Sequence, residues 1–323
     1  MKELQSALVT GGAGFIGGHL VERLLKQGWR VRVLDNFSSG SYGNLDLSHK
    51  DLEIIEGDVR DRETCLKACK QVDSVFHLAA LVSVVGSVED PLLSHEVTLG
   101  GTLNMLQAAR DQAVRRFVFS SSAAVYGNTE ISPTDEKQPL DPLSPYATAK
   151  ASGEFYCRNF YQLYGLETVI LRYFNVFGPR QNVTSGYAAV IPAFVKAAVE
   201  GRSPTVYGDG LQTRDFVYVE NVAEANICAA TVPGIAGNCF NVAGGEGTSL
   251  LQLLDAIGKA MHISLNPRFE PMRSGEIRDS LADTSHARKV LNFQPIVTFE
   301  DGLRRTVDAS FSAANERIAA LHE

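Results

Sequence analysis

The sequence predicts an α/β protein with a doubly wound parallel sheet, followed by a smaller α/β lobe. A glycine-rich turn at residues 11–17 directly follows an apolar strand pattern and opens a helical one. Strand and helix patterns then alternate as far as residue 174, which is typical of a parallel sheet covered by helices. Beyond that point, glycines and prolines become frequent and the elements become short. We therefore predict a cofactor-binding domain at 1–174 and a substrate-binding lobe at 175–323, with a segment near 212–243 that returns to the sheet.

The composition excludes several classes of protein. The 323 residues carry a formal net charge of −7 and no basic run, so binding to a nucleic-acid backbone is not expected. The five cysteines are scattered and odd in number, and the pair Cys65 and Cys69 lacks further zinc ligands, so we predict neither disulfides nor a metal. No apolar run is long enough to span a bilayer and no signal-peptide pattern is visible, so we expect no membrane partner and a cytoplasmic location.

The glycine turn is the first functional signal. A strand pattern covers residues 4–10 and a helical pattern covers 15–26. Between them, Gly11 permits a tight turn, Gly14 lets a pyrophosphate approach the helix N-terminus, and Gly17 lets the helix pack on the sheet. The spacing is GxxGxxG, and in this strand–turn–helix context it predicts a Rossmann-type dinucleotide site.

Later strand ends carry residues suited to the rest of a dinucleotide. Asp35 can accept hydrogen bonds from both hydroxyls of a ribose and repels a 2′-phosphate, so NAD is favoured over NADP. Asp58 is placed to hydrogen-bond an adenine ring, and Ala79 and Ala80 are small enough for the cofactor to pass over them. The strand patterns that lead to these residues lie at 30–34, 52–56 and 73–78.

A run of serines ends the next predicted strand. A long helical pattern at 90–110 precedes a strand pattern at 116–119, which ends in Ser120, Ser121 and Ser122. Ligands bind beyond the carboxyl ends of parallel strands, so a serine hydroxyl here can bridge a substrate hydroxyl and a phenol. The pattern itself does not distinguish among the three serines. Further patterns predict a strand at 168–171 and a helix at 220–230.

Residues 141–150, Asp-Pro-Leu-Ser-Pro-Tyr-Ala-Thr-Ala-Lys, predict the start of a long helix. Ser144 is a good N-cap and Pro145 suits the first helical position. Tyr146 and Lys150 then lie four residues apart on one helix face. An ammonium beside a phenol stabilises the phenolate and lowers the phenol pKa from its usual value near 10. We therefore predict an acid or base that works near neutral pH.

These signals combine into a family resemblance. In order, the motifs are TGGAGFIG at 10–17, GDV at 57–59, HLAA at 77–80, SSSAAVYG at 120–127, YATAK at 146–150 and RYFNVFGPRQ at 172–181. Over nearly its whole length the chain resembles the extended short-chain dehydrogenases/reductases, and among them the nucleotide-sugar 4-epimerases. The resemblance implies NAD as cofactor, a UDP-sugar substrate and a homodimer. It also implies that Ser122 is the catalytic hydroxyl, that Tyr146 is the base, and that Lys150 holds the nicotinamide ribose.

The implied reaction inverts C4 of the sugar. Tyr146 takes the O4 proton while NAD takes the hydrogen from C4, and the 4-keto sugar turns over before both are returned. The implied cofactor contacts are Gly11, Gly14, Phe15, Ile16, Asp35, Asn36, Gly40, Asp58, Val59, Leu78, Ala79, Ala80, Tyr146, Lys150 and Tyr173. The implied substrate contacts are Ser83, Ser122, Asn175, Ala189, Val190, Tyr207, Arg214, Arg273 and Ser280.

One position bears on the choice of sugar. In similar enzymes the residue before Leu-Ala-Asp acts as a size gate, and here it is the small Ser280. A small gate favours UDP-N-acetylglucosamine and UDP-N-acetylgalactosamine, and it leaves UDP-glucose, UDP-galactose and UDP-glucuronate open. Thr98, Gly86 and Glu276 depart from residues that many similar enzymes carry.

Two other functions compete with epimerisation. A nucleotide-sugar dehydratase on this fold would resemble enzymes with Asp-Glu after the catalytic hydroxyl, where this chain has Ala123 and Ala124. Alanines cannot transfer protons, which disfavours dehydration more strongly than decarboxylation. A non-catalytic NAD-binding sensor would be expected to have lost Tyr146 or Lys150, and both are present.

Overall fold

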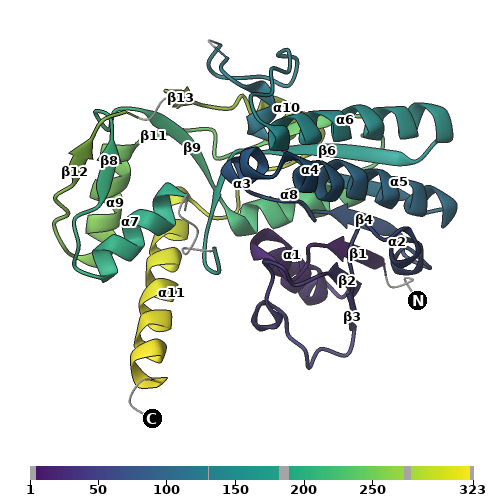
Figure 1. Ribbon diagram of the computed structural model, residues 1–323, viewed down its shortest axis with the longest axis horizontal. Helices are drawn as coiled ribbons and strands as arrows, with labels where there is room; N and C mark the ends of the chain where they lie inside the picture. Colours follow the sequence, from purple (N-terminus) through teal and green to yellow (C-terminus); the bar gives the residue numbers. More distant parts are fainter. Residues whose placement is uncertain (1–4, 130, 182–188, 273–277, 321–323) are drawn as a thin grey trace.

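The computed structural model describes residues 5–129, 131–181, 189–272 and 278–320. Its centre is a seven-stranded parallel sheet in the order β10-β6-β5-β4-β1-β2-β3, so the predicted doubly wound sheet is confirmed (Figure 1). The strands are β1 (Ser6–Thr10), β2 (Arg30–Asp35), β3 (Leu52–Glu56), β4 (Ser74–His77), β5 (Arg116–Ser122), β6 (Glu167–Tyr173) and β10 (Cys239–Val242).

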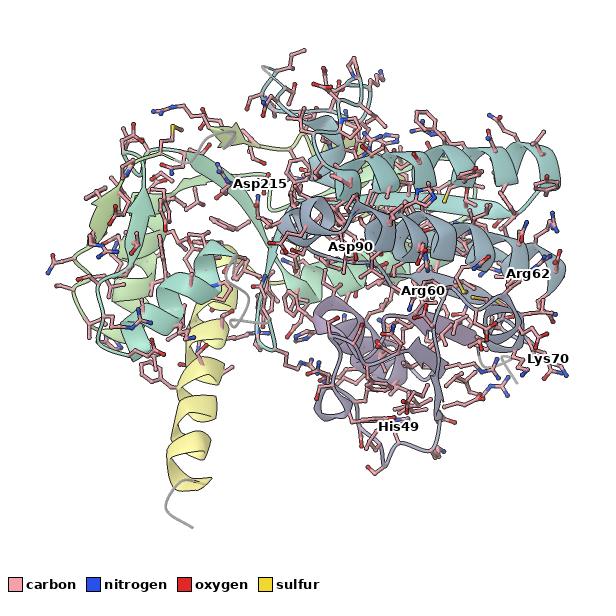
Figure 2. The ribbon with its side chains drawn as sticks, in the orientation of Figure 1. His49, Arg60, Arg62, Lys70, Asp90 and Asp215 are labelled. Carbon is pink, nitrogen blue, oxygen red and sulfur yellow. The ribbon has the colours of Figure 1, made fainter. Side chains whose placement is uncertain are left out.

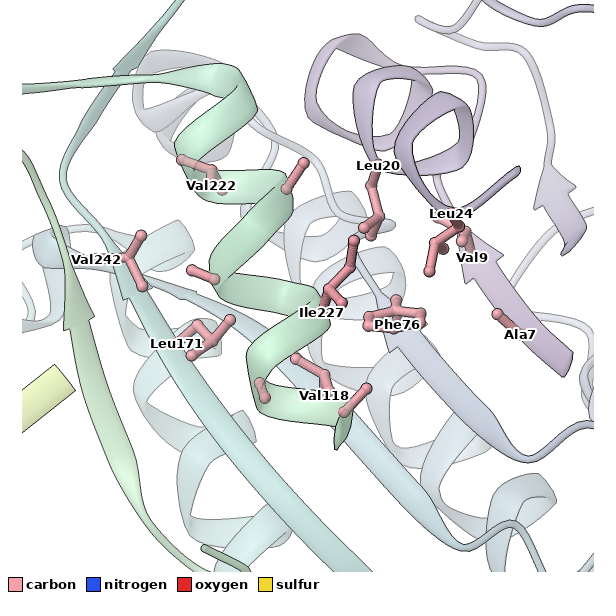
Figure 3. Close-up of a cluster of buried hydrophobic side chains, with 14 of the residues drawn as sticks. Ala7, Val9, Leu20, Leu24, Phe76, Val118, Leu171, Val222, Ile227 and Val242 are labelled. Carbon is pink, nitrogen blue, oxygen red and sulfur yellow. The ribbon is translucent and has the colours of Figure 1, made fainter. Parts of the chain in front are cut away.

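Helices cover both faces of this sheet. One face carries α1 (Phe15–Lys26) and α8 (Val219–Thr231), and the other carries α2 (Arg62–Ala68), α5 (Gly101–Asp111) and α6 (Pro145–Tyr164). Strand side chains alternate between the two cores, as the period of a strand requires. In β1, Val9 packs on the α1 and α8 side and Leu8 on the other. Figure 3 shows the first core, in which Leu24 and Ile227 lie over Phe76.

The chain leaves the central sheet after β6 and later returns to it. α8 packs beside α1, and β10 then pairs with β6, with Phe240 opposite Leu171 and Val242 opposite Tyr173. Segments that follow residue 174 therefore supply one helix and one edge strand of the central sheet. Apolar burial explains the return, since Val222 and Val242 are fully buried in the same core as Leu171.

The remaining elements form a smaller lobe. A four-stranded sheet holds β7 (Asn175–Phe177), β9 (Thr213–Tyr218), β11 (Gly247–Ser249) and β13 (Asp279–Ser280), and a second pair holds β8 (Thr205–Tyr207) and β12 (Arg268–Glu270). The other helices are α7 (Val190–Val199), α9 (Leu250–Met261), α10 (Ser285–Val290) and α11 (Phe299–Ala320). α7, α9 and α11 share a core with Phe177, and α11 extends away from the lobe in Figure 1.

The helix predicted at 90–110 is interrupted. It consists of α4 (Pro91–Ser94), a π-helical segment (His95–Gly100) and α5, and a separate helix, α3 (Val84–Glu89), precedes it. Asp90 accepts a hydrogen bond from the Leu93 N–H at 2.9 Å and so caps α4. Two successive glycines, Gly100 and Gly101, lie where the π segment joins α5, and glycine tolerates such distortions of a helix. Short 3₁₀ turns also occur at Tyr42–Asn44 and Ala123–Tyr126.

Two further findings concern the described residues. None of the described helices combines the length and the hydrophobicity that a membrane crossing needs. The five cysteines, Cys65, Cys69, Cys157, Cys228 and Cys239, carry free thiols.

Candidate active site

The carboxyl end of β5 and the first turns of α6 bring three predicted residues together. Ser144 caps α6 through its side-chain oxygen, as predicted, and thereby fixes where the helix begins. The Ser122 hydroxyl lies close enough to the phenol of Tyr146 to lower the pKa of that phenol. The Lys150 ammonium donates to the Ser120 carbonyl at 2.6 Å, one helical turn further along. A hydroxyl, a phenol and an ammonium therefore meet at one edge of the sheet.

The structure also distinguishes the three serines by the partners of their side chains. Ser120 hydrogen-bonds the Tyr173 hydroxyl at 2.9 Å, and Ser121 donates to Glu154 at 2.6 Å, so both side chains point into the core. Ser122 is the one of the three that acts on the Tyr146 phenol, and its Oγ also accepts a hydrogen bond from the Ala124 N–H at 3.2 Å. This is the serine that the resemblance indicates.

Burial governs the acidity of this group. It raises the pKa of Tyr146 to about 12, and the neighbouring Ser122 hydroxyl acts on this pKa in the opposite direction. It lowers the pKa of Lys150 to about 8, which still leaves the amine mostly protonated at neutral pH. The prediction that Lys150 lowers the phenol pKa is therefore wrong for the protein by itself. The ammonium points to Ser120 and lies 5.9 Å from the centroid of the Tyr146 ring, so desolvation outweighs its charge.

The glycine turn has the shape that a pyrophosphate requires. Gly11 has a φ of +68°, and a Cβ added there would lie 2.9 Å from the Ala79 N atom. A Cβ on Gly17 would lie 2.0 Å from the Gly11 carbonyl oxygen. The first amides of α1, from Phe15 and Ile16, have no acceptor within the helix and face an approaching anion. The geometry of the turn thus suits the diphosphate of a dinucleotide.

Asp35 is buried at the end of β2, beside this turn. Its Oδ2 accepts a hydrogen bond from the Ala13 N–H at 2.9 Å, and its Oδ1 accepts from the Phe37 N–H at 2.8 Å. A carboxylate has about four acceptor sites, so capacity remains for ribose hydroxyls. The carboxylate therefore organises the turn and the following loop and still suits an NAD ribose.

The predicted adenine side of the site forms a polar cluster. Asn36 donates to Asp58 at 2.9 Å, and the hydrogen bonds from Arg60 hold the pKa of Asp58 at about 2. Gly40 packs so closely on Ala13 that an added Cβ would lie 2.9 Å from the Ala13 Cβ. The other predicted cofactor contacts are the buried Val59 and the partly exposed residues after β4, namely Leu78, Ala79 and Ala80.

Arg180 has a guanidinium suited to a diphosphate, but its side chain contacts residues of the cofactor half. Its Nη2 lies 2.8 Å from Nδ1 of His19, and its Nη1 donates to the Asn44 carbonyl at 3.1 Å. It also pairs with Glu22 of α1 at 2.9 Å. The Asn44 side chain in turn donates to the Ala13 carbonyl at 2.8 Å. We name this set, Arg180, His19, Glu22 and Asn44, the α1 clasp.

The predicted substrate residues gather around a second feature, a cavity of about 430 Å³ in the smaller lobe. Five of them line it: Asn175, Ala189, Val190, Tyr207 and Arg214. Ser280 lies beside it in β13, where its backbone is in register with that of Arg214 in β9.

The remaining predicted substrate residues lie elsewhere. Ser83 caps α3, accepting from the Gly86 N–H at 2.9 Å, and α3 packs against α6. Ser122 is at the end of β5, on the phenol side of the site. Arg273 lies outside the described residues.

Sequence reasoning missed two glutamines in the cavity wall, Gln181 and Gln212. Each has a buried Oε1 atom without a hydrogen-bond partner in the described part of the chain. Their amide nitrogens are used, since Gln212 donates to the Tyr207 carbonyl at 2.6 Å and Gln181 to the Val176 carbonyl at 3.1 Å. Unpartnered buried acceptors in a cavity wall are suited to a ligand with N–H or O–H donors. The position of Gln181 at the end of the GPRQ motif is the one signal that could have indicated it.

The structure combines three features: a glycine turn at a helix N-terminus, an acidic residue at the end of β2, and a serine, a tyrosine and a lysine at the switch point of the sheet. Together these features define a dinucleotide-dependent enzyme. The model of the NAD dependent epimerase/dehydratase family matches residues 7–243, which include all of these features. The chain belongs to this family. The predicted resemblance, fold class and NAD dependence are therefore confirmed.

Individual relatives cover almost the whole chain. The chain is 41% identical to a UDP-glucose 4-epimerase of Mycolicibacterium smegmatis, over 93% of its own length and 97% of the relative's. A UDP-N-acetylglucosamine 4-epimerase from Methanobrevibacter ruminantium M1, solved in complex with UDP-N-acetylmuramic acid, aligns with a TM-score of 0.92 and 42% identity, covering 96% of this chain and 99% of that chain. A UDP-glucose 4-epimerase of Thermus thermophilus, solved in complex with NAD, aligns with a TM-score of 0.85 and 39% identity, covering 94% and 98%.

Proposed function

We propose that the protein is an NAD-dependent UDP-sugar 4-epimerase that acts on UDP-N-acetylglucosamine and UDP-N-acetylgalactosamine. The placement of the Ser122 hydroxyl beside the Tyr146 phenol, at the switch point of the sheet, carries this proposal. It sets a proton-transfer pair where a sugar hydroxyl can reach it. The similarity to 4-epimerases over more than nine-tenths of the chain supports the same reaction.

The chain's own part in the chemistry is to hold and move one proton. Tyr146 takes the proton from O4 of the sugar and later returns it, and Ser122 orients the sugar hydroxyl toward the phenol. Lys150 supplies a positive charge one helical turn away and has donors for ribose hydroxyls. When bound, NAD supplies reversible oxidation and reduction at C4.

A phenol with a pKa of about 12 is too weak an acid to be ionised at neutral pH, so it must gain positive charge nearby to act as a base. A Lys150 ammonium turned toward the phenol would supply such a charge, and an oxidised nicotinamide bound beside it would add to that charge. The proposed contacts that hold NAD remain those given above: the glycine-turn residues, Asp35, Asn36, Gly40, Asp58, Val59, the 78–80 segment and Tyr173.

The cavity in the smaller lobe is the proposed UDP site. Arg214 supplies a guanidinium for the diphosphate, and Tyr207 an aromatic face for the uracil. Asn175, Ala189 and Val190 line the same space. The buried Oε1 of Gln212 is an acceptor suited to the imide N–H of uracil. Strong binding at the nucleotide leaves the sugar free to turn over between the two halves of the reaction.

The choice of an N-acetylated sugar rests on the small Ser280, beside Arg214. Arg273 remains a proposed diphosphate contact and Ser83 a proposed sugar contact. A dehydratase is disfavoured because the 3₁₀ turn after Ser122 presents Ala123 and Ala124, which have no proton to give. UDP-glucose, UDP-galactose and UDP-glucuronate remain the alternative substrates.

An NMR assay of C4 inversion tests the proposal. The purified protein with NAD is incubated separately with UDP-N-acetylglucosamine, UDP-glucose, UDP-galactose and UDP-glucuronate. We expect inversion to be fastest with the N-acetylated sugar. Release of carbon dioxide, formation of a 4-keto-6-deoxy sugar, or no inversion of any of them contradicts the proposal.

We further propose that the 1–174 part, with α8 and β10, binds NAD and that the smaller lobe binds the UDP-sugar. A homodimer through α5 and α6 is supported by exposed apolar side chains on α6, such as Phe155 and Leu163, and sedimentation analysis tests it. A cytoplasmic location is supported by the five free thiols, and cell fractionation tests it.

A further inference from the structure

Asp215 is a buried acidic residue between the two halves of the molecule. It lies on β9, directly after Arg214, and its side chain has no exposed surface. Figure 2 labels it where the strand runs between the smaller lobe and the sheet domain. Within the described ranges, neither arginine nor lysine pairs with its carboxylate. An ion pair with a described residue therefore does not explain why this carboxylate is buried.

Its two oxygens hold two separate segments. Oδ1 accepts from the Gly244 N–H at 2.8 Å and from the Gly245 N–H at 3.1 Å, in the turn that follows β10. Oδ2 accepts from the Ala282 N–H at 3.1 Å and from Gly245 at 3.2 Å. Ala282 comes two residues after Ser280. One side chain thus ties the returning edge of the central sheet to the segment that carries the small gate residue.

The backbone of Asp215 reaches the proposed substrate site as well. Its carbonyl accepts from Nδ2 of Asn175 at 3.0 Å and so orients that amide in the cavity wall. Arg214 precedes it in β9 and pairs in register with Ser280 in β13. Asn175, Arg214 and Ser280 therefore all depend on where Asp215 is held.

A carboxylate is required for this geometry. Three N–H groups from two directions need two acceptor oxygens, and an asparagine offers one oxygen and an amide that would face an N–H. Burial raises the pKa of Asp215 to about 6, against the three backbone hydrogen bonds, so the ionised form is held at a cost to folding. Residues kept in the fold at such a cost are frequent at functional sites.

We propose that Asp215 is a positioning residue for the nucleotide-sugar site, whose carboxylate fixes the 280–282 segment and the 244–245 turn in the geometry that Asn175 and Arg214 need to bind UDP-sugars. The proposal rests on the proposed function, since it concerns the same site. It assigns Asp215 no contact with the substrate. Tyr146 and Ser122 lie outside this set of contacts, so their chemistry is expected to be little affected.

The test compares the wild-type holoenzyme with Asp215→Asn and with the matched control Asp255→Asn, an exposed residue on α9. Calorimetry gives the Kd for UDP-N-acetylglucosamine, and kinetics give KM and kcat. Thermal unfolding and bound NAD report the fold and the cofactor site. For Asp215→Asn we expect Kd and KM to rise about 10-fold, the effect of one lost hydrogen bond to a charged group, while kcat changes far less. NAD content is expected to be unchanged, and the unfolding midpoint to be unchanged or higher.

A second variant removes the donor of the same hydrogen bond. Ala282→Pro removes the N–H that Oδ2 accepts, and it leaves the bonds between Thr134 and its neighbours in place, since those use Leu281 and Asp283. It is expected to weaken binding of the nucleotide sugar in the same direction.

Three results overturn the inference. They are an unchanged Kd in a folded Asp215→Asn variant, an equal change in the Asp255→Asn control, and a joint loss of NAD, thermal stability and UDP-sugar affinity. A wild-type protein that binds UDP-N-acetylglucosamine without inverting it refutes the proposed function instead, and the Kd comparison still decides the role of Asp215.

Discussion

Nη2 of Arg172 lies 2.6 Å from Oε2 of Glu154, and both side chains are buried. Glu154 is on α6 and Arg172 on β6, so the pair ties the helix of Tyr146 to the sheet. The same carboxylate accepts from Ser121 at 2.6 Å, and Ser121 directly precedes Ser122 in β5. Arg172 also donates to Tyr126 at 2.9 Å. Helix α6, strand β6 and the end of strand β5 thus share one buried polar network.

Removing one member of this pair is expected to be severe. Glu154→Leu leaves a buried guanidinium without its counter-charge, and we expect the free energy of unfolding to fall by about 3–5 kcal/mol. Urea denaturation measures it. The double variant Glu154→Leu/Arg172→Met is expected to recover much of that loss, because no buried charge is left unpaired. A single variant within about 1 kcal/mol of the wild type contradicts this account.

The proposed base has a direct test. Tyr146→Phe removes the O–H that receives the O4 proton, and we expect kcat to fall by about 10²–10⁴-fold or more. Bound NAD is expected to be retained, since the glycine turn and Asp35 are untouched. Tyr156→Phe, an exposed tyrosine on the same helix, serves as the control. Full activity in Tyr146→Phe would remove this residue from the chemistry.

The pH dependence follows from Lys150. Burial lowers its pKa to about 8, and the proposed reaction uses its positive charge, so we expect kcat to decline as the pH rises through about 8. In Lys150→Arg the guanidinium stays charged, and the decline is expected to disappear even if the overall rate is lower. The contribution of Lys150 to folding stability changes with pH in the opposite direction. An unfolded lysine has a pKa of about 10.4, so the contribution of Lys150 to stability is complete above that pH and is lost as the pH falls through about 8.

The α1 clasp is expected to retain the cofactor. Arg180 bonds to His19 and Asn44, and Asn44 bonds to Ala13 of the glycine turn, so the clasp holds the 36–44 loop against that turn. For Arg180→Ala we expect less NAD after purification and faster release of NAD, measured as nucleotide content and by fluorescence. Arg202→Ala, at an exposed arginine, is the matched control. Equal NAD content in both variants would show that the clasp has no part in retention.

Much of the sheet domain could be predicted because its signals are local. Glycine spacing, the Asp35 position and the Ser144 cap each depend on neighbouring residues, and each is found where predicted. The interruption of the helix at His95–Gly100 could not be predicted in the same way, since an apolar period continues through it. There the buried Thr98 accepts a hydrogen bond from the Leu81 N–H at 3.2 Å, a contact between segments far apart in sequence.

The features of the site that could not be predicted from the sequence share one cause. Whether a phenol becomes more or less acidic depends on how deeply it is buried and on where the neighbouring ammonium points, and neither follows from Tyr-x-x-x-Lys spacing. The contacts of Arg180 with α1 likewise could not be predicted, because they join residues far apart in the sequence. The roles of Gln181, Gln212 and Asp215 depend on cavities and on backbone groups brought together from distant segments.

The return of the chain through α8 and β10 limits how the protein can be divided. A fragment that stops at residue 174 would lose the strand that pairs with β6 and the helix that covers Leu171 and Val118. It would expose a row of unpaired amides and carbonyls on β6 beside bare apolar surface, which is a template for aggregation between copies. Truncated expression of the dinucleotide half therefore requires these two later elements to be grafted back, for example by joining β6 to α8 through a short artificial loop.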